Sequence, residues 1–245
     1  MELTAAGWTL ALLAGVLVGL SKGGLPVVAM LSVPVLAQVM SPVTAAGLLL
    51  PVYVVSDMFG IWVWRRAFDR RVLAIVAPAT AVGVALGWAT ASMVSDRVVG
   101  GLIGLIGTAF ALNAILRPRL GSARTARLAP GLFWGTIAGF TSFVSHAGGP
   151  PWQVYALPLR MEKAVFAGTT TILFAWVNAV KLIPYYALGQ LALDNLKIAA
   201  LLMLPAAVAV FAGAWLVRII PHDAFFKLVI WALLLISLRL IWQAI

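Results

Sequence analysis

Six long apolar runs constrain the fold of this 245-residue chain more than any other feature. A helix that crosses the hydrocarbon core of a bilayer, ~30 Å thick, needs about 20 apolar residues. Only 10% of the residues are charged, whereas soluble domains carry about 25%. The runs are Val43–Trp64, Val72–Ala91, Val98–Leu116, Ala164–Leu188, Leu196–Val217 and Ala224–Ile241. The sequence therefore predicts an all-α, polytopic transmembrane helical bundle.

Two further apolar stretches, Ala5–Val39 and Leu128–Leu159, are interrupted by short polar segments. The first break is Ser21-Lys22-Gly23-Gly24, and the second is Ser145-His146-Ala147-Gly148-Gly149-Pro150-Pro151. Each stretch is predicted to form a pair of shorter helices. Such a pair either crosses the membrane twice or enters it and returns as a re-entrant hairpin.

The two interrupted stretches begin two copies of one sequence pattern. Gly15-x-x-x-Gly19 recurs as Gly135-x-x-x-Gly139, Asp57 aligns with Asn178, and Pro78 aligns with Pro205, at offsets of about 120–127 residues. These matches predict a first membrane repeat over residues 1–120 and a second over 121–245, within one membrane domain. Three full spans in each half make the repeats inverted, as in many secondary transporters.

Basic residues predict the orientation, because cytoplasmic loops are rich in arginine and lysine. The net charge of +10 is therefore assigned to topology and to contacts with anionic lipid headgroups, not to nucleic acid. Both termini are expected outside the cell (inner) membrane. The loop residues that favour this orientation most are Arg65, Arg66, Arg70, Arg71, Arg117, Arg119, Arg124 and Arg127.

Enzyme and metal-site motifs are missing from the sequence. The chain has no cysteine, so thiolate chemistry and disulfides are excluded. It has no H-E-x-x-H, P-loop or G-x-S-x-G motif and no pair of buried carboxylates. We therefore expect a protein that is not an enzyme and that holds no cofactor or metal.

The few polar groups inside the apolar stretches are the candidate site. An ionisable residue within a span costs about 2.5–3.5 kcal/mol on insertion scales, so a functional role is the default hypothesis. Glycine lets the backbone expose its N–H groups, and a helix that restarts after a break points a positive dipole end at it. Two such tips meeting near the membrane midplane would form one oxyanion site. The predicted substrate-binding residues are Ser21, Lys22, Gly23, Gly24, Thr141, Ser142, Ser145, His146, Gly148, Gly149, Gln153, Asn178 and Lys181.

Asp57 and His146 are the candidates for coupling to a proton, since they are the only groups in these stretches suited to such a switch. Other interpretations stay open at this point. The glycines can serve close helix packing alone, and Lys22 lies in a cytoplasmic loop if the first pair spans. His146 can bond a neighbouring carbonyl, and Asp57 can form a structural ion pair with Lys181.

The order of these elements resembles the sulfite exporter TauE/SafE family over nearly the whole chain. The resemblance rests on G-x-x-x-G before a Gly-Gly break, a following x-P-x-L element, and a second copy with Gly-Gly-Pro-Pro. Lys22-Gly23-Gly24-Leu25 replaces a longer glycine run that is common in the family. The positions that match the family pattern are Gly23, Gly24, Pro34, Gly148, Gly149, Pro150 and Pro158.

The resemblance implies a membrane carrier, an exporter driven by an ion gradient, for sulfite or an organosulfonate such as sulfoacetate or taurine. The expected partners are the anion, a coupling proton or sodium ion, membrane lipids and further copies of the chain. A small-anion channel and a non-transporting membrane scaffold subunit are the alternatives.

Overall fold

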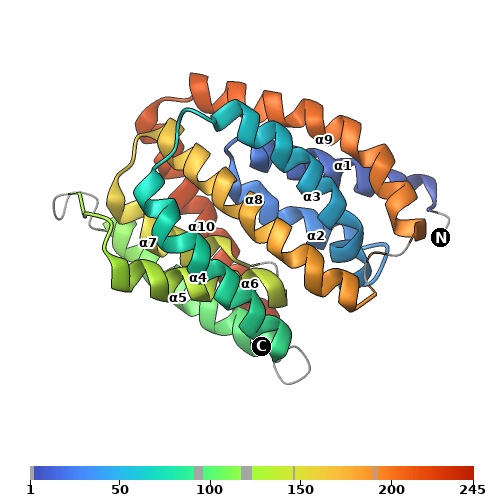
Figure 1. Ribbon diagram of the computed structural model, residues 1–245, viewed down its shortest axis with the longest axis horizontal. Helices are drawn as coiled ribbons and strands as arrows, with labels where there is room; N and C mark the ends of the chain where they lie inside the picture. The colour runs from blue at the N-terminus through green and yellow to red at the C-terminus, as the bar shows by residue number, and fades with distance from the viewer. Residues whose placement is uncertain (1–2, 91–95, 117–122, 146, 190, 192) are drawn as a thin grey trace. The chain divides into compact units, whose positions relative to one another are not determined.

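A computed structural model describes residues 3–90, 96–116, 123–145, 147–189, 191 and 193–245. Over these residues the chain is helical and has no strand, which confirms the predicted all-α membrane bundle (Figure 1). The helices are α1 (Ala5–Lys22), α2 (Ala29–Leu36), α3 (Pro42–Trp64), α4 (Arg70–Ala89), α5 (Asp96–Leu116), α6 (Leu128–Ser145), α7 (Gly149–Ala156), α8 (Lys163–Ala187), α9 (Leu193–Ile219) and α10 (His222–Ala244). Two 3₁₀ turns, η1 (Pro26–Val28) and η2 (Leu157–Leu159), flank the short helices.

Each of the six apolar runs forms a helix, namely α3, α4, α5, α8, α9 and α10. By length and composition, six helices of the described chain can cross a membrane: α1, α4, α8, α10, Thr44–Trp64 of α3 and Asn195–Ile219 of α9. Gly104–Leu116 of α5 and Leu128–Val144 of α6 are shorter apolar helices. The chain is a multi-pass membrane protein.

The two interrupted stretches form pairs of unequal length. The first helices, α1 and α6, have 18 residues each, and the second helices, α2 and α7, have 8 each. At 1.5 Å per residue, an eight-residue helix is about 12 Å long and cannot cross a hydrocarbon core of ~30 Å. By itself, neither α2 nor α7 is therefore long enough to cross the membrane as a regular helix.

The chain divides into two compact units. Unit 1 comprises Met1–Phe68 and Ala167–Ile219, and unit 2 comprises Asp69–Phe166 and Ile220–Ile245. Each unit therefore combines segments from both of the predicted repeats, 1–120 and 121–245. This division does not test the predicted repeats, because the two halves of a duplicated sequence can exchange helices when they fold.

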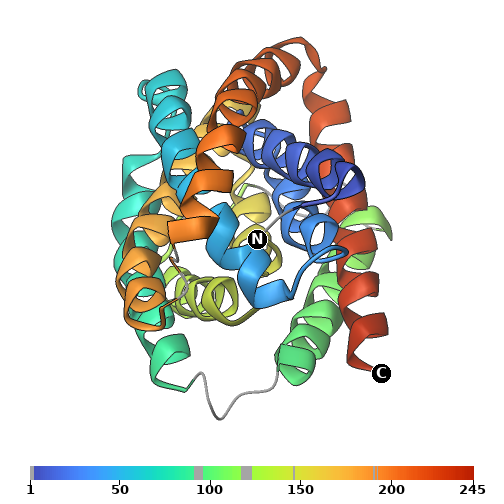
Figure 2. The same ribbon diagram turned by 90° about the vertical axis from the view of Figure 1, so that its right-hand side faces the viewer.

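In unit 1, α1 packs along α9 (Figures 1 and 2). A methyl group on Gly19 would overlap the Ala206 carbonyl, and one on Gly23 would lie 2.6 Å from the Gly213 Cα. The two backbones thus approach so closely that neither glycine can carry a side chain. This is the small-residue packing that helices in membranes use in place of hydrophobic collapse.

In unit 2, α4 packs along α6 in the corresponding way. A methyl group on Gly83 would overlap the Thr136 carbonyl, and one on Gly139 would overlap the Thr80 carbonyl. Helices α5 and α10 also pack closely, with Gly104 and Gly107 against Ser237. In both units, a glycine-bearing helix that begins one predicted repeat packs on a helix of the other repeat.

Candidate functional site

A buried ion pair joins α1 to α3 in unit 1. The Lys22 ammonium, at the last residue of α1, lies 2.7 Å from Asp57 Oδ1. Asn178 of α8 donates a hydrogen bond from Nδ2 to the other oxygen, Asp57 Oδ2, over 2.8 Å. All three residues are at most 6% exposed. Three helices that are far apart in the sequence therefore meet at one carboxylate.

The spacing along α3 explains why this helix presents a polar face at that point. Tyr53, Ser56, Asp57 and Gly60 lie at positions i, i+3, i+4 and i+7, which share one side of an α-helix. A Cβ on Gly60 would lie 3.0 Å from the Lys22 carbonyl oxygen. The small residue therefore lets the end of α1 approach α3, so that the lysine can reach the carboxylate.

Tyr53, on the same face of α3 as Asp57, also contacts Lys22, and the sequence analysis missed it. The Lys22 ammonium lies 5.0 Å from the centre of the Tyr53 ring, a distance at which a cation is attracted to the ring face. The Tyr53 hydroxyl bonds with Ser32 Oγ over 2.5 Å and donates to the Ala29 carbonyl over 3.1 Å. The four-residue spacing from Tyr53 to Asp57 was the signal available in the sequence.

Helix α8 contributes a second polar face to unit 1. Thr171, Asn178 and Lys181 are seven and three residues apart, so they lie on one side of the helix. Thr171 Oγ1 donates to the Lys22 carbonyl over 3.2 Å. Lys181 is 2% exposed, and its ammonium lies 5.4 Å from the Tyr185 ring centre. The sequence analysis did not single out Thr171, which belongs to a run of three buried threonines.

The buried charge of this cluster is not balanced. Among the described buried residues of the chain, the ionisable groups with a formal charge are Lys22, Lys181 and Asp57. Lys22 lies near enough to Lys181 for the positive charges of the two ammonium groups to repel each other. Two cations and one carboxylate give the cluster a formal charge of +1.

The first Gly-Gly break closes α1 as a capped C-terminus. The Gly23 and Gly24 N–H groups donate to the Gly19 and Ser21 carbonyls over 2.9 and 3.1 Å. The Ser21 hydroxyl donates to the Val18 carbonyl over 2.6 Å. The donors predicted to bind an anion here are thus engaged by α1 itself. What the break supplies is Lys22, held at the negative end of a helix dipole.

The second break lies in unit 2 and is closed by Thr141. Its hydroxyl donates to the Ile137 and Ala147 carbonyls over 2.8 and 3.1 Å, and the Ala147 N–H donates to the Thr141 carbonyl. Helix α7 begins at Gly149 with no side-chain cap. Because prolines 150 and 151 have no N–H, the amides of Gly148 and Gly149 are the donors that the start of α7 can offer.

Gln153 of α7 lies just beyond this break. It is 2% exposed, and its Oε1 has no hydrogen-bond partner among the described residues. A buried amide oxygen without a partner costs free energy, and such groups call for an explanation. The neighbouring predicted residue Ser142 is also buried. Ser145 ends α6 with its side chain undescribed, and His146 lies outside the described residues.

The structure thus groups the predicted residues by unit. Unit 1 brings together the first break, Asp57, Asn178 and Lys181, whereas the second break and Gln153 belong to unit 2. The interpretation of Lys22 as a loop lysine is wrong, because it is 4% exposed and paired. The ion-pair partner of Asp57 is Lys22, where the sequence had suggested Lys181. Whether both breaks form one anion site stays a prediction.

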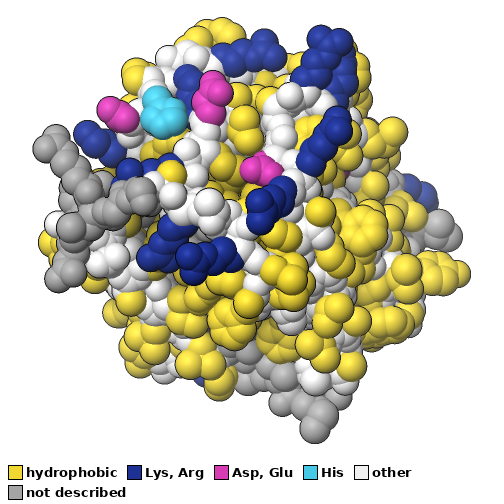
Figure 3. Space-filling view, turned by 60° about the vertical axis from the view of Figure 1, so that its left-hand side comes forward, with side chains coloured by type: hydrophobic (Ala, Val, Ile, Leu, Met, Phe, Trp, Pro, Cys, Tyr) yellow, Lys and Arg dark blue, Asp and Glu magenta, His cyan; other side chains and the backbone are white. Residues whose placement is uncertain are grey.

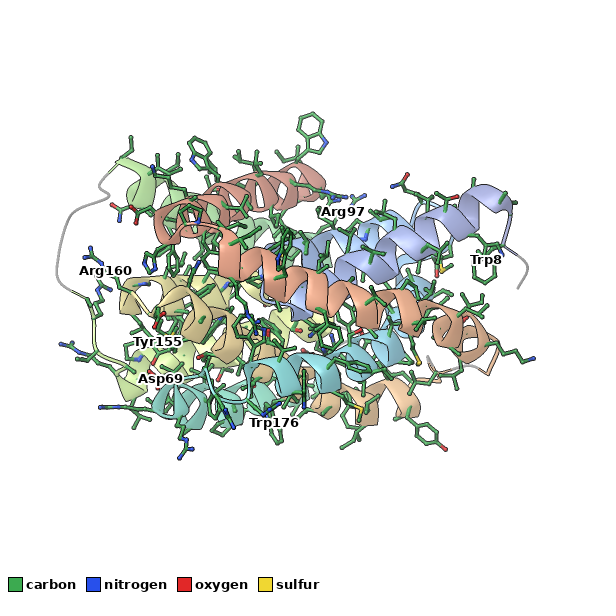
Figure 4. The ribbon with its side chains drawn as sticks, turned by 90° about the horizontal axis from the view of Figure 1, so that it is seen from above. Trp8, Asp69, Arg97, Tyr155, Arg160 and Trp176 are labelled. Carbon is green, nitrogen blue, oxygen red and sulfur yellow. The ribbon has the colours of Figure 1, made fainter. Side chains whose placement is uncertain are left out.

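Basic residues gather at one end of unit 2. The Arg124 N–H donates to the Pro158 carbonyl, Tyr155 donates to the Arg127 carbonyl, and Lys163 donates to the Ile220 carbonyl. Exposed Lys and Arg side chains are visible on the face seen in Figure 3, and Figure 4 shows Asp69, Tyr155 and Arg160 at the same end of unit 2. One end of unit 2 therefore holds the ends of four elements that adjoin these residues, namely α4, α6, η2 and α10.

Comparison with known proteins gives one match. The model of the family described as Sulfite exporter TauE/SafE matches residues 10–240. No curated protein and no solved structure matches the chain significantly. Within the described residues, no three His, Asp or Glu side chains gather as a metal site would require.

Proposed function

Because the chain belongs to the sulfite exporter TauE/SafE family, a family of membrane transporters, we propose that it exports a small sulfur-containing oxyanion across the cell membrane. The substrate class is sulfite or an organosulfonate such as sulfoacetate or taurine. The observation that carries this proposal is the buried cluster of Lys22, Lys181, Asp57 and Asn178 in unit 1.

The charge of the cluster suits a singly charged sulfonate or hydrogensulfite group. Charged side chains buried in a membrane protein are expensive unless they are paired. A sulfonate placed between the two ammonium groups would add a negative charge to a cluster whose formal charge is +1. Asn178 and the hydroxyl groups nearby would then orient the sulfonate oxygens through hydrogen bonds.

The second break is the proposed partner of this cluster in transport. Its contribution would come from the amides of Gly148 and Gly149 and from Gln153, with Thr141, Ser142, Ser145 and His146 nearby in the sequence. Movement of the helix pairs that carry the two breaks, against the remaining spans, would give alternating access. Asp57 and His146 are the proposed coupling groups.

Anion binding by purified protein tests the proposal. Titration with sulfite, sulfoacetate and taurine should show saturable binding of at least one. Replacing Lys181 with Met should weaken that binding about 10–100-fold, because a charge-assisted hydrogen bond contributes about 1.5–3 kcal/mol. Lys197→Met is the matched control, since Lys197 is an exposed lysine of α9. Equal losses in the two variants, or no saturable binding at all, would contradict the proposal.

Flux into liposomes separates a transporter from a channel or a scaffold. A transporter should show saturable uptake that unlabelled anion on the opposite side stimulates. A channel would conduct without this stimulation, and a scaffold would give no flux.

A further inference from the structure

We infer that Asp57 is an internal competitor for the substrate's place on Lys22, so that binding of each anion is accompanied by uptake of one proton at Asp57. This inference rests on the proposed function and specifies how the same site is coupled. It follows from the geometry around the carboxylate.

Lys22 is already occupied in the absence of substrate. Its ammonium lies 2.7 Å from Asp57 Oδ1, with both side chains 5% exposed. An ammonium at that distance from a carboxylate offers a second anion little attraction, since the pair is neutral. A substrate oxyanion therefore has to take the place that Oδ1 holds on Lys22.

Among the described groups around the displaced carboxylate, Lys181 is the one cation besides Lys22. Helix α1 has no ionisable side chain other than Lys22, and α2 has none. The basic residues described on α9, Lys197 and Arg218, are exposed. The remaining titratable groups on the faces packed around Asp57 are Tyr53 on α3 and Lys181 and Tyr185 on α8.

Lys181 is the other proposed substrate ligand, so in the bound state the substrate anion occupies its ammonium group, and the displaced carboxylate gains no cation of its own. A buried carboxylate that has lost its partner is strongly disfavoured, and uptake of a proton is the ordinary way to remove the charge.

The two oxygens of Asp57 have separate roles in this exchange. Oδ2 accepts the Asn178 hydrogen bond at 2.8 Å and keeps it after protonation, as the carbonyl oxygen of the acid. The proton from solvent therefore adds to Oδ1, the oxygen that loses Lys22 when the anion binds. The resulting O–H can donate to the bound oxyanion.

Ser56 supplies a further hydrogen-bonding group for the state in which the anion has replaced Asp57 on Lys22. It lies beside Asp57 on the polar face of α3 and is completely buried, and its Oγ has no hydrogen-bond partner among the described residues. Its hydroxyl is available to the protonated carboxyl or to the anion.

Proton counting tests the inference in the intact protein. Methanesulfonate is the probe, because its sulfonate remains ionised across the pH range and any proton taken up belongs to the protein. In weak buffer with a pH indicator, wild-type protein should take up about one proton for each sulfonate bound. Because the bound state holds one more proton than the empty state, affinity should fall about tenfold for each unit that the pH rises.

Asp57→Asn is the matched variant, since the amide has the shape of the protonated acid and cannot release a proton. It should bind methanesulfonate without proton uptake and with an affinity that does not change with pH. If this variant fails to fold, the number of protons taken up by the wild type still tests the inference.

The outcomes separate the two proposals. Saturable binding by the wild type without proton uptake overturns this inference and leaves the proposed function standing. The same holds if Asp57→Asn retains the wild-type pH dependence. Absence of saturable binding of every anion by the wild type overturns the proposed function itself, and this inference with it.

Discussion

Asp57 and Asn178 bond to each other although they lie 121 residues apart. They are also the two positions that the predicted internal repeat aligns. Contacts between equivalent residues arise where two related copies meet about a common axis. One copy carries the carboxylate and the other an amide, so the pair can share a hydrogen bond. Two carboxylates at these positions would repel, and two amides would leave Lys22 without a counter-charge.

At the same scale, the Lys22–Asp57 pair should show strong energetic coupling. Lys22→Met leaves a buried carboxylate without its cation and should lower the free energy of unfolding by about 3–5 kcal/mol. Lys22→Met combined with Asp57→Asn removes both charges and should recover most of that loss. Thermal unfolding of the two single variants and the double variant in detergent measures the coupling. Additive losses would show that the two residues do not depend on each other.

At the scale of the helices, glycines have two distinct roles in this protein. Gly19, Gly83 and Gly139 lie within regular helices, and at each of them the backbone of a neighbouring helix leaves no room for a side chain. Gly24 instead takes a φ of +109°, which turns the chain out of α1 towards η1. Close packing and chain reversal are therefore carried by different glycines, although all belong to similar small-residue motifs.

Replacing Gly24 with alanine tests the turn. The positive φ costs an L-residue about 1–2 kcal/mol, and the new Cβ would lie 2.8 Å from the Ala167 Cβ. We expect a loss of about 2–4 kcal/mol in the free energy of unfolding, because overpacking adds to the strain. Gly189→Ala is the control: its φ is +67°, but nothing lies within 4 Å of the added Cβ. Equal losses in the two variants would show that packing around Gly24 is unimportant.

At the scale of the whole molecule, the sequence repeats and the compact units divide the chain differently. The repeats are expected to change at about residue 120, whereas the units change at Phe68/Asp69, Phe166/Ala167 and Ile219/Ile220. The first and last of these changes lie in or beside the connections α3–α4 and α9–α10. The second lies within the first turns of α8. Each unit therefore combines helices from both of the predicted repeats.

Labelling of introduced cysteines tests the sidedness of unit 2, since the wild type has none. Thr125 is exposed at its basic end, beside Arg124, and Gln243 is exposed near the end of α10. Helix α10 starts near the basic end and, with 23 residues, is about 34 Å long, so Gln243 is at the opposite end. Thr125→Cys should react with a membrane-impermeant maleimide only from the cytoplasm, and Gln243→Cys only from outside. The reverse pattern would overturn the positive-inside orientation.

Much of the fold follows from local sequence. Apolar runs of about 20 residues fix the position of each long helix, because lipid offers the backbone no alternative hydrogen-bond partners. The break at Gly23-Gly24 was also predictable, since these residues stop a helix wherever it lies. The candidate residues Lys22, Asp57, Asn178 and Lys181 were identified because polar groups are rare inside such runs.

The sequence alone determined which segments are helical, where they break and which few polar groups they bury. Tertiary structure alone decided that Asp57 pairs with Lys22 and Asn178, that Tyr53 and Thr171 join this cluster, and that the first Gly-Gly amides cap α1. The reason is physical. Helix formation depends on hydrogen bonds four residues apart, whereas the partner of a buried charge depends on which helices pack together.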